Sequence, residues 1–348
     1  MEKTDIKSLN YEEVQALLTE MGEKAFRGKQ IYQWMHQKLA DGFEDMNNIP
    51  KALKQKLEER CSFTWLEPVE ILTSQVDGTQ KYLFRLQDGH VIESVLMKYQ
   101  HGNSVCISTQ VGCRMGCRFC ASTIGGRTRN LEPSEMLEQV YRIQKISGER
   151  VSNLVMMGTG EPLDNYENVI RFIHLLSDEH GLNISQRNIT LSTCGLVPQM
   201  KQLAEEGLAI TLALSLHASS QEKREELLPI AKKYEIHEVV NACRLYYEKT
   251  GRRITFEYSL VGGKNDTQED AEKLAHLIKG LNCHVNLIPV NPIKERSYVQ
   301  SGKKVIADFK NKLENCGINV TIRREMGRDI SGACGQLRKS YMDKEKKE

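Results

Sequence analysis

The chain has 348 residues, with 48 Lys and Arg against 46 Asp and Glu, so its net charge is only +2. This length suits one large domain or two unequal ones, and a 40% apolar fraction beside 27% charged residues excludes a largely disordered chain. No apolar run approaches the roughly 20 residues of a membrane span, and the first residues lack the apolar core of a signal peptide, so we expect a cytoplasmic protein with no membrane partner. The near balance of charge excludes a globally basic nucleic-acid binder, and any basic surface must be local.

Residues 1–62 predict a small helical domain, and residues 63–98 predict hairpins. Apolar side chains at helical spacing place helices over 11–21, 25–39 and 51–60, and Ser8 or Asn10 could cap the first. The charged residues of this domain are typical of solvated helix faces, with docking of a partner as the alternative. After it, Asp-Gly pairs at 77–78 and 88–89 separate stretches of alternating polarity. Because Asp-Gly suits tight turns, we expect a small antiparallel meander.

From residue 99 to 330 the pattern alternates between strand and helix. Strands are expected over 104–109, 153–157, 188–192, 209–217, 253–260, 284–290 and 319–323, and helices over 134–146, 169–177, 269–277 and 303–316. Such alternation implies right-handed crossovers and a parallel sheet. About six units are fewer than the eight of a complete barrel, so an open doubly wound sheet and a partial barrel both fit. In either fold, functional residues lie at the carboxyl ends of the strands.

Three cysteines, Cys113, Cys117 and Cys120, lie within one short loop directly after a predicted strand. In a cytoplasmic chain, clustered cysteines indicate metal or redox chemistry rather than structural disulfides. Zinc is one alternative, but structural zinc normally takes four protein ligands, and no fourth Cys or His is near in sequence. Three thiolates suit a [4Fe–4S] cluster that leaves one iron open to a non-protein ligand. Three unrelated buried thiols are the other alternative.

Small and polar residues follow several of the predicted strands. Gly160 and Glu161 belong to the Gly-Thr-Gly-Glu-Pro segment after the strand that ends at 157, and further polar residues at strand ends are Ser192, Ser215, His217 and Asn291. Hydroxyl, amide, imidazole and carboxylate groups there could hydrogen-bond a cofactor. Any one of them alone is more often a turn or capping residue, and His217 could also be a structural histidine with satisfied hydrogen bonds.

The three-cysteine loop, with Phe119 before its last cysteine, resembles the radical S-adenosylmethionine (SAM) superfamily. The resemblance implies an α/β fold built on a partial (βα)6 TIM-like barrel, extended by the N-terminal helical domain and the hairpins. It also implies that SAM chelates the open iron, and that one electron from the cluster cleaves SAM to a 5′-deoxyadenosyl radical. The implied cofactor contacts are Gly160, Glu161, Ser192, Ser215, Leu216, His217 and Asn291, and the implied cluster ligands are Cys113, Cys117 and Cys120.

A narrower resemblance covers nearly the whole chain. It rests on Cys334 in Gly-Ala-Cys-Gly-Gln-Leu, on Cys106, on Gly-Glu-Pro-Leu at 160–163 and on Val-Thr-Ile-Arg-Arg at 320–324. Together these resemble the radical-SAM RNA methyltransferases that act at adenine C2 of large-subunit (23S) ribosomal RNA and, in many members, of transfer RNA. A sister branch methylates C8 of the same adenine, and Pro162 favours the C2 branch. The resemblance implies a monomer that takes electrons from a low-potential donor such as flavodoxin.

The same resemblance assigns roles to three further side chains. Cys334, in the C-terminal segment 331–348, would take a methyl group from one SAM molecule, and a radical formed with a second SAM would activate that methyl group to add to C2. Glu93 would accept the C2 proton. Cys106 would then release the covalent protein–RNA adduct by forming a transient disulfide with Cys334. From the residues alone, both cysteines could be small buried side chains and Glu93 a solvent-facing strand residue.

Two groups of arginines could supply a local RNA surface. One group surrounds the cysteine loop and the other precedes Cys334: Arg114, Arg118, Arg127 and Arg129, then Arg323, Arg324 and Arg328. Arginine forks suit phosphates, although some of these could be ordinary surface residues. The competing functions are another radical-SAM reaction and a non-catalytic iron–sulfur or zinc RNA-binding protein. The second leaves Cys334 and Glu93 unexplained.

Overall fold

The computed structural model describes residues 3–100, 102–291, 293 and 296–336. Within these residues a ten-stranded sheet runs in the order β14-β13-β12-β11-β10-β9-β6-β5-β4-β3. The strands from β6 to β14 pair in parallel, whereas β3, β4 and β5 continue the sheet antiparallel. The bounds are β3 Glu67–Thr73, β4 Gln80–Arg85, β5 Val91–Tyr99, β6 Gly102–Cys106, β9 Val151–Met156, β10 Ile189–Thr193, β11 Thr211–Ser215, β12 Ile254–Leu260, β13 Cys283–Pro289 and β14 Asn319–Ile322.

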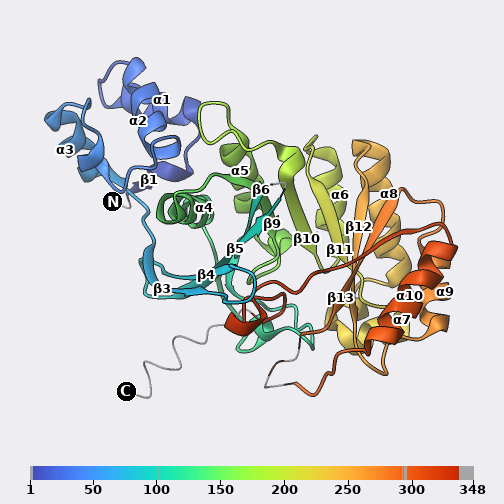
Figure 1. Ribbon diagram of the computed structural model, residues 1–348. Helices are drawn as coiled ribbons and strands as arrows, with labels where there is room; N and C mark the ends of the chain where they lie inside the picture. Colours follow the sequence, from blue (N-terminus) through green and yellow to red (C-terminus); the bar gives the residue numbers. More distant parts are fainter. Residues whose placement is uncertain (1–2, 101, 292, 294–295, 337–348) are drawn as a thin grey trace.

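Helices connect the parallel strands, as the alternating pattern predicts. They are α4 Pro133–Ser147, α5 Tyr166–Ser177, α6 Val197–Glu205, α7 Gln221–Leu227, α8 Ile236–Thr250, α9 Gln268–Leu277 and α10 Lys303–Asn315. Figure 1 shows them spread across the sheet, from α4 at the left of the view to α9 and α10 at the right. From β6 to β14 the parallel strands follow one another in chain order without the reversal of a doubly wound sheet, and the sheet does not close, so the predicted α/β partial barrel is confirmed.

The predicted antiparallel meander is present and is part of the main sheet. Gly78 and Gly89, in the turns on either side of β4, have φ values of +72° and +84°, which a glycine adopts without strain. Beyond the meander, β5 also pairs with β6, from Val95 opposite Cys106 to Tyr99 opposite Gly102. This pairing fixes the strand that carries Glu93 beside the strand that carries Cys106.

The N-terminal residues form a lobe with a core of its own, which Figure 1 shows at the upper left. Its helices are α1 Tyr11–Glu20, α2 Phe26–His36 and α3 Lys51–Arg60, and β1 Thr4–Asp5 pairs with β2 Cys61–Ser62. Asn10 caps α1: its side chain accepts from the Glu13 amide at 2.8 Å, and the Glu13 carboxylate accepts from the Asn10 amide at 2.8 Å. Ser8 instead donates to Asp5.

The domain boundaries 1–62, 63–98, 99–330 and 331–348 stay predictions. Of the last segment, residues 337–348 lie outside the described residues. No helix among the described residues is long and apolar enough to span a membrane.

Candidate active site

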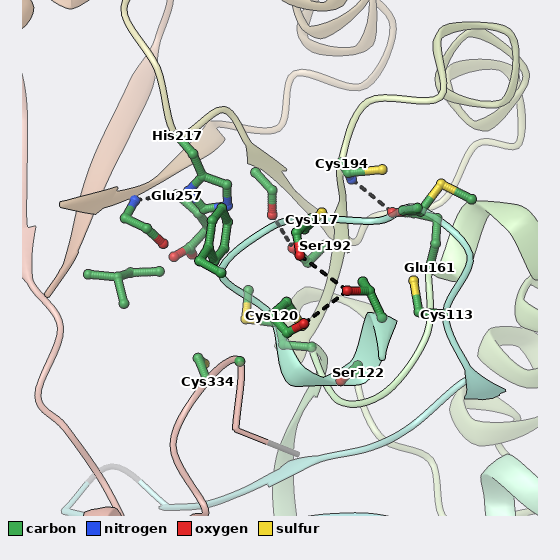
Figure 2. A pocket seen from close by; sticks show the side chains of 18 of the residues that line it. Cys113, Cys117, Cys120, Ser122, Glu161, Ser192, Cys194, His217, Glu257 and Cys334 are labelled. Atoms are coloured by element: carbon green, nitrogen blue, oxygen red, sulfur yellow. Dashed lines mark hydrogen bonds between the residues drawn. The ribbon is translucent and has the colours of Figure 1, made fainter. Parts of the chain in front are cut away.

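The carboxyl ends of the parallel strands surround a cavity of about 140 Å³. Ten of the residues singled out in the sequence line it: Cys113, Cys117, Cys120, Gly160, Glu161, Ser192, Ser215, His217, Asn291 and Cys334. Figure 2 shows the cysteine loop and the Cys334 loop approaching this space from different parts of the chain. The side chain of Leu216 is fully buried and does not line the cavity.

The loop that carries the three cysteines is shaped by backbone contacts. It follows β7 Gln110–Gly112, which pairs with β8 Arg127–Asn130. Gly112 has a φ of +77°, and a Cβ built there would lie 2.0 Å from the carbonyl oxygen of Gly126. The Cys113 amide donates to that same oxygen at 3.1 Å. Only glycine fits this close approach of two backbone segments.

The three thiols have a chemistry that suits a cationic centre. Burial is the largest cause that raises the pKa of each: that of Cys113 to about 12, and those of Cys117 and Cys120 in the same direction. Burial thus favours the neutral thiols, whereas bound iron would favour the thiolates, because a metal ion stabilises coordinating thiolates. In the described part of the chain, however, no three Cys, His, Asp or Glu side chains are arranged to hold a metal ion. By their chemistry, however, three thiols that line one cavity are the donor set that an iron–sulfur cluster takes.

Glu161 is held at the cavity wall by two backbone amides. Its carboxylate accepts from the Leu163 amide at 3.1 Å and from the Cys194 amide at 2.8 Å. Burial raises its pKa, and the bond from Cys194 acts in the opposite direction. A buried carboxylate in this situation gains most from a cationic partner, such as the ammonium group of an amino acid.

The hydroxyls of Ser192 and Ser215 lie 3.4 Å apart at the ends of neighbouring strands. His217 sits next to them with a positive φ of 56°, and its Nδ1 accepts from the Ser259 amide at 2.9 Å. Burial, and then the charge of Arg224, lower the pKa of His217 to about 3. The ring is therefore neutral and partly occupied by a structural hydrogen bond, which was the alternative considered for it.

Cys334 is positioned by three contacts. The Asn291 amide donates to the Cys334 carbonyl oxygen at 2.9 Å, and the Ala121 amide of the cysteine loop donates to the Gly335 carbonyl oxygen at 2.8 Å. Arg323 donates from Nη1 to the Cys334 Sγ at 3.3 Å. Asn291 therefore holds the segment that carries Cys334 in addition to lining the cavity.

Arg323 and Glu257 hold positions in the site that the sequence did not reveal. The sequence grouped Arg323 with arginines that could bind RNA, and the structure places it in the cavity wall, where it pairs with Glu257 at 3.5 Å. The reason is register, because the Arg323 amide donates to the Leu287 carbonyl oxygen and continues β14 along β13. Glu257 lies in β12 among apolar residues, and a buried acid in an apolar strand is the signal that could have found it.

A second cavity, of about 90 Å³, adjoins the first. Cys106 lines only the second cavity, whereas Cys334, Arg323 and Asn291 line both. Burial, and then the nearby Cys334, raise the pKa of the Cys106 thiol to about 12. Each cysteine of the described residues is a free thiol. Cys334 thus stands at the border between the three-cysteine cavity and the cavity of Cys106.

Glu93 is buried, with 2% of its surface exposed, so the alternative of a solvent-facing strand residue is wrong. It forms an ion pair with Lys81 at 3.0 Å across the β4–β5 pair. The same Lys81 ammonium donates to the Ser331 carbonyl oxygen at 3.3 Å, three residues before Cys334. Glu93 is not among the residues that line the two cavities, but this lysine links it to the Cys334 segment.

Most of the remaining arginines already have acidic partners. Arg114 and Arg127 both pair with Asp164, and Arg129 pairs with Asp88 and Glu135. Arg328 pairs with Glu325. The expectation of phosphate-binding groups is therefore best retained for Arg118 and Arg324, which are exposed and make no ion pair with another described residue. The sequence could not show this, since Asp88 and Asp164 are distant along the chain.

Comparison with known proteins agrees with this geometry. Residues 107–278 match the model of the radical SAM superfamily, and residues 4–63 match that of the ribosomal RNA large subunit methyltransferase N-terminal domain. The chain is 65% identical to the "Probable dual-specificity RNA methyltransferase RlmN" of Lachnospira eligens, over 98% of this chain and 97% of that one. The chain belongs to the RlmN family of RNA methyltransferases.

Other members of the RlmN family agree. A Clostridium botulinum protein of the same name is 58% identical over 95% of each chain. A solved structure, a radical SAM methyltransferase from Sphaerobacter thermophilus, superposes with a TM-score of 0.93 at 43% identity, covering 97% of this chain and 99% of that one. The predicted family, fold and RNA-methylating activity are confirmed, and membership implies a 4Fe–4S cluster and SAM.

Proposed function

We propose that this chain methylates C2 of an adenine in 23S ribosomal RNA and in transfer RNA, by way of a methyl group carried on Cys334. The observation that carries the proposal is the position of Cys334 between two cavities. One cavity holds the three thiols and the strand-end polar groups. The other holds Cys106, the only thiol besides Cys334 that lines this second cavity among the described residues.

The first cavity suits the family's cofactors. Cys113, Cys117 and Cys120 would hold the cluster, which together with SAM supplies a carbon radical when both are bound. Glu161 would accept hydrogen bonds from the SAM ammonium group. The remaining polar contacts would come from Gly160, Ser192, Ser215, His217 and Asn291, which line the cavity. The resemblance also implied Leu216, which does not line it.

Arg323 would prepare Cys334 for its first step. Transfer of a methyl cation from SAM to sulfur requires a nucleophilic thiolate. The guanidinium donates to this sulfur through Nη1, and the same nitrogen lies 3.5 Å from Oε2 of Glu257. The pair of Arg323 and Glu257 would thus hold the sulfur in place for this transfer.

Glu93 and Cys106 would complete the reaction after the carbon of Cys334 has joined C2. Glu93 would accept the C2 proton, and Lys81 would stabilise its charge before that transfer. The radical adduct would also give up one electron with that proton. Cys106 would then attack the Cys334 sulfur and break its bond to the methylene carbon, which takes up a proton to become the methyl group of the adenine, while the two sulfurs form a disulfide. Because burial keeps Cys106 a neutral thiol, its proton must leave as it attacks. A low-potential donor such as flavodoxin would supply electrons, and the enzyme would act as a cytoplasmic monomer.

The roles of the two cysteines are tested by matched substitutions. Cys334→Ala cannot accept a methyl group and should never become linked to RNA. Cys106→Ala should still add to adenine and then stall, because no other thiol shares the second cavity among the described residues. Denaturing gels of protein purified from expressing cells, run before and after nuclease treatment, separate the two outcomes. Cys316→Ala, at an exposed thiol, serves as the control and should turn over normally.

An adduct with Cys334→Ala, or normal turnover with either site variant, would overturn the assigned roles. The methylated position has a test of its own. Nucleosides digested from the RNA of cells that lack the chain, and of the same cells complemented with it, should differ in 2-methyladenosine. A difference in 8-methyladenosine instead would place the chain in the sister branch.

A further inference from the structure

Arg224, in α7, is fully buried and has fewer partners than a buried guanidinium needs. Its Nη2 donates to the Cys194 carbonyl oxygen at 2.7 Å. Its Nε and Nη1 are buried without a hydrogen-bond partner among the described residues. None of the ion pairs between described side chains includes Arg224. Because burying an uncompensated charge is strongly unfavourable, such a residue calls for a compensating group.

The surroundings of Arg224 are the back of the cysteine loop. The Arg118 amide of that loop donates at 2.9 Å to the carbonyl oxygen of Leu227, the last residue of α7. A Cβ built at Gly195, which follows Cys194, would lie 3.1 Å from Nη2 of Arg224. Cys194 in turn donates its amide to Glu161, as Figure 2 shows. The end of α7 is therefore packed against the cysteine loop, and the Arg224 guanidinium reaches the segment that fixes Glu161.

The groups near this guanidinium that can become negatively charged are cysteine thiols. Burial is the largest influence on the pKa of Cys117 and raises it, while the Arg224 charge acts to lower it. The charges that favour the ionised state of Arg224 itself, against burial, come from Cys194, Cys117 and Cys243. Of these three, Cys117 and Cys194 line the cavity, and Cys117 is the one that belongs to the three-cysteine loop with Cys113 and Cys120.

We infer that Arg224 is the counter-charge of the metal centre that the three-cysteine loop holds, and that it tunes the reduction of that centre. Three thiolates make the centre anionic, and reduction adds one further negative charge. A guanidinium keeps its proton even when buried, so it stabilises the reduced state more than the oxidised one. Net charge and burial are among the factors that set the potential of iron–sulfur clusters. The inference rests on the proposed cluster ligands and adds a positioning residue behind them.

The test measures the midpoint potential of the anaerobically reconstituted protein, by reductive titration followed with electron paramagnetic resonance. Arg224→Gln removes the charge, and Arg224→Lys keeps it. The midpoint should shift to more negative values in Arg224→Gln and stay close to wild type in Arg224→Lys. Arg118→Gln is the control, because that arginine adjoins Cys117 in sequence but is exposed, and solvent screens its charge. An unshifted Arg224→Gln, or an equal shift in Arg224→Lys, would overturn the inference.

Thermal unfolding distinguishes two roles of Arg224: a counter-charge of the metal centre, or only a hydrogen-bond donor that holds the Cys194 carbonyl oxygen. As a counter-charge, Arg224 stabilises the iron-loaded protein more than the iron-free protein, so Arg224→Gln should lower the unfolding temperature more in the loaded form. A supporting role predicts equal losses in both forms, and an iron-free variant that cannot fold would also contradict the inference. If the wild-type protein itself binds no iron, the proposed cluster ligands fail first, which separates the two results.

Discussion

Arg323 contacts both the Cys334 sulfur and the carboxylate of Glu257. Oε2 of Glu257 lies 3.5 Å from the Arg323 guanidinium and accepts a hydrogen bond from the Asn286 side-chain amide at 3.0 Å. Glu257 therefore has two polar partners, and its contact with Arg323 helps to hold that guanidinium beside the sulfur. A thiolate formed at Cys334 would complete a row of negative, positive and negative charges along the cavity wall, from Glu257 through Arg323 to the sulfur.

Arg323→Gln should slow the methylation of Cys334 by about 10- to 100-fold, since a hydrogen bond to a charged group contributes roughly 1.5–3 kcal/mol. Mass spectrometry of the Cys334 peptide over time, with SAM supplied, measures this step without RNA. The control is Arg324→Gln, which removes the neighbouring but exposed arginine and should methylate at the wild-type rate. An equal loss in both variants would show that Arg323 acts only through the general charge of this region.

At the scale of elements, the cysteine loop depends on one backbone contact more than on its side chains. Gly112 and Gly125 both have positive φ values, of +77° and +88°, so an alanine is strained at either position. Only at Gly112 would the added Cβ also meet backbone, 2.0 Å from the Gly126 oxygen, while at Gly125 it would meet nothing within 4 Å. The two glycines therefore separate strain from collision within one loop.

Gly112→Ala should reduce the iron content of the reconstituted protein severely, because the loop must open to accommodate the methyl group. Gly125→Ala should cost about 1–2 kcal/mol of stability and retain most of the iron. Iron and sulfide analysis beside thermal unfolding gives both quantities. Similar iron contents in the two variants would mean that this approach of backbones does not shape the site.

The elements themselves were largely predictable, and the reasons are local. Apolar periodicity placed helix 51–60 with both of its ends correct, and it placed each parallel strand to within a few residues. Polar residues at strand ends predicted the cavity, because parallel strands end at the same edge. What the sequence could not show were pairings across distance: Arg323 with Cys334, Lys81 with Glu93, and Asp164 with two arginines. These depend on how strands are staggered, which local propensity does not fix.

At the scale of the whole molecule, the N-terminal lobe is anchored to the barrel by buried polar groups. Lys7 pairs with Glu138 of α4, and both are buried. His36 Nδ1 lies 2.7 Å from the Tyr141 hydroxyl, also in α4. Tyr32 donates to Asp178 after α5 at 3.1 Å. If the lobe and the barrel separated, these buried polar groups would lose their partners, which is costly. We therefore expect the lobe and the barrel to move as one body.

His36 makes this anchoring sensitive to pH. Burial, and then the charge of Lys7, lower its pKa from 6.5 to about 3. The lowered pKa means that the folded state favours the neutral ring, so this stabilisation is complete above pH 6.5 and is lost as the pH falls toward 3. Between pH 6.5 and 5 the free energy of unfolding should fall by about 2 kcal/mol through this residue, at about 1.36 kcal/mol per pH unit.

Urea unfolding at pH 7.5 and at pH 5, compared between wild type and His36→Gln, measures this share, and the variant should lose less stability on acidification. The control is His237→Gln, which changes an exposed histidine of α8. A variant whose stability falls as steeply as that of wild type would show that His36 does not carry this dependence.

The turn between β3 and β4 has a practical consequence for anyone who modifies this chain. Val76 at its tip is 80% exposed, and such tips usually tolerate insertions. Here, however, Ser74 and the Gln75 amide donate to Asp329 at 2.7 and 3.0 Å, and Asp77 accepts from the Gly327 amide at 2.9 Å. These hydrogen bonds hold the turn against the segment that leads to Cys334. An affinity tag, a fluorescent label or a new chain terminus placed at this inviting surface position would loosen the reactive sulfur from some 250 residues away in sequence.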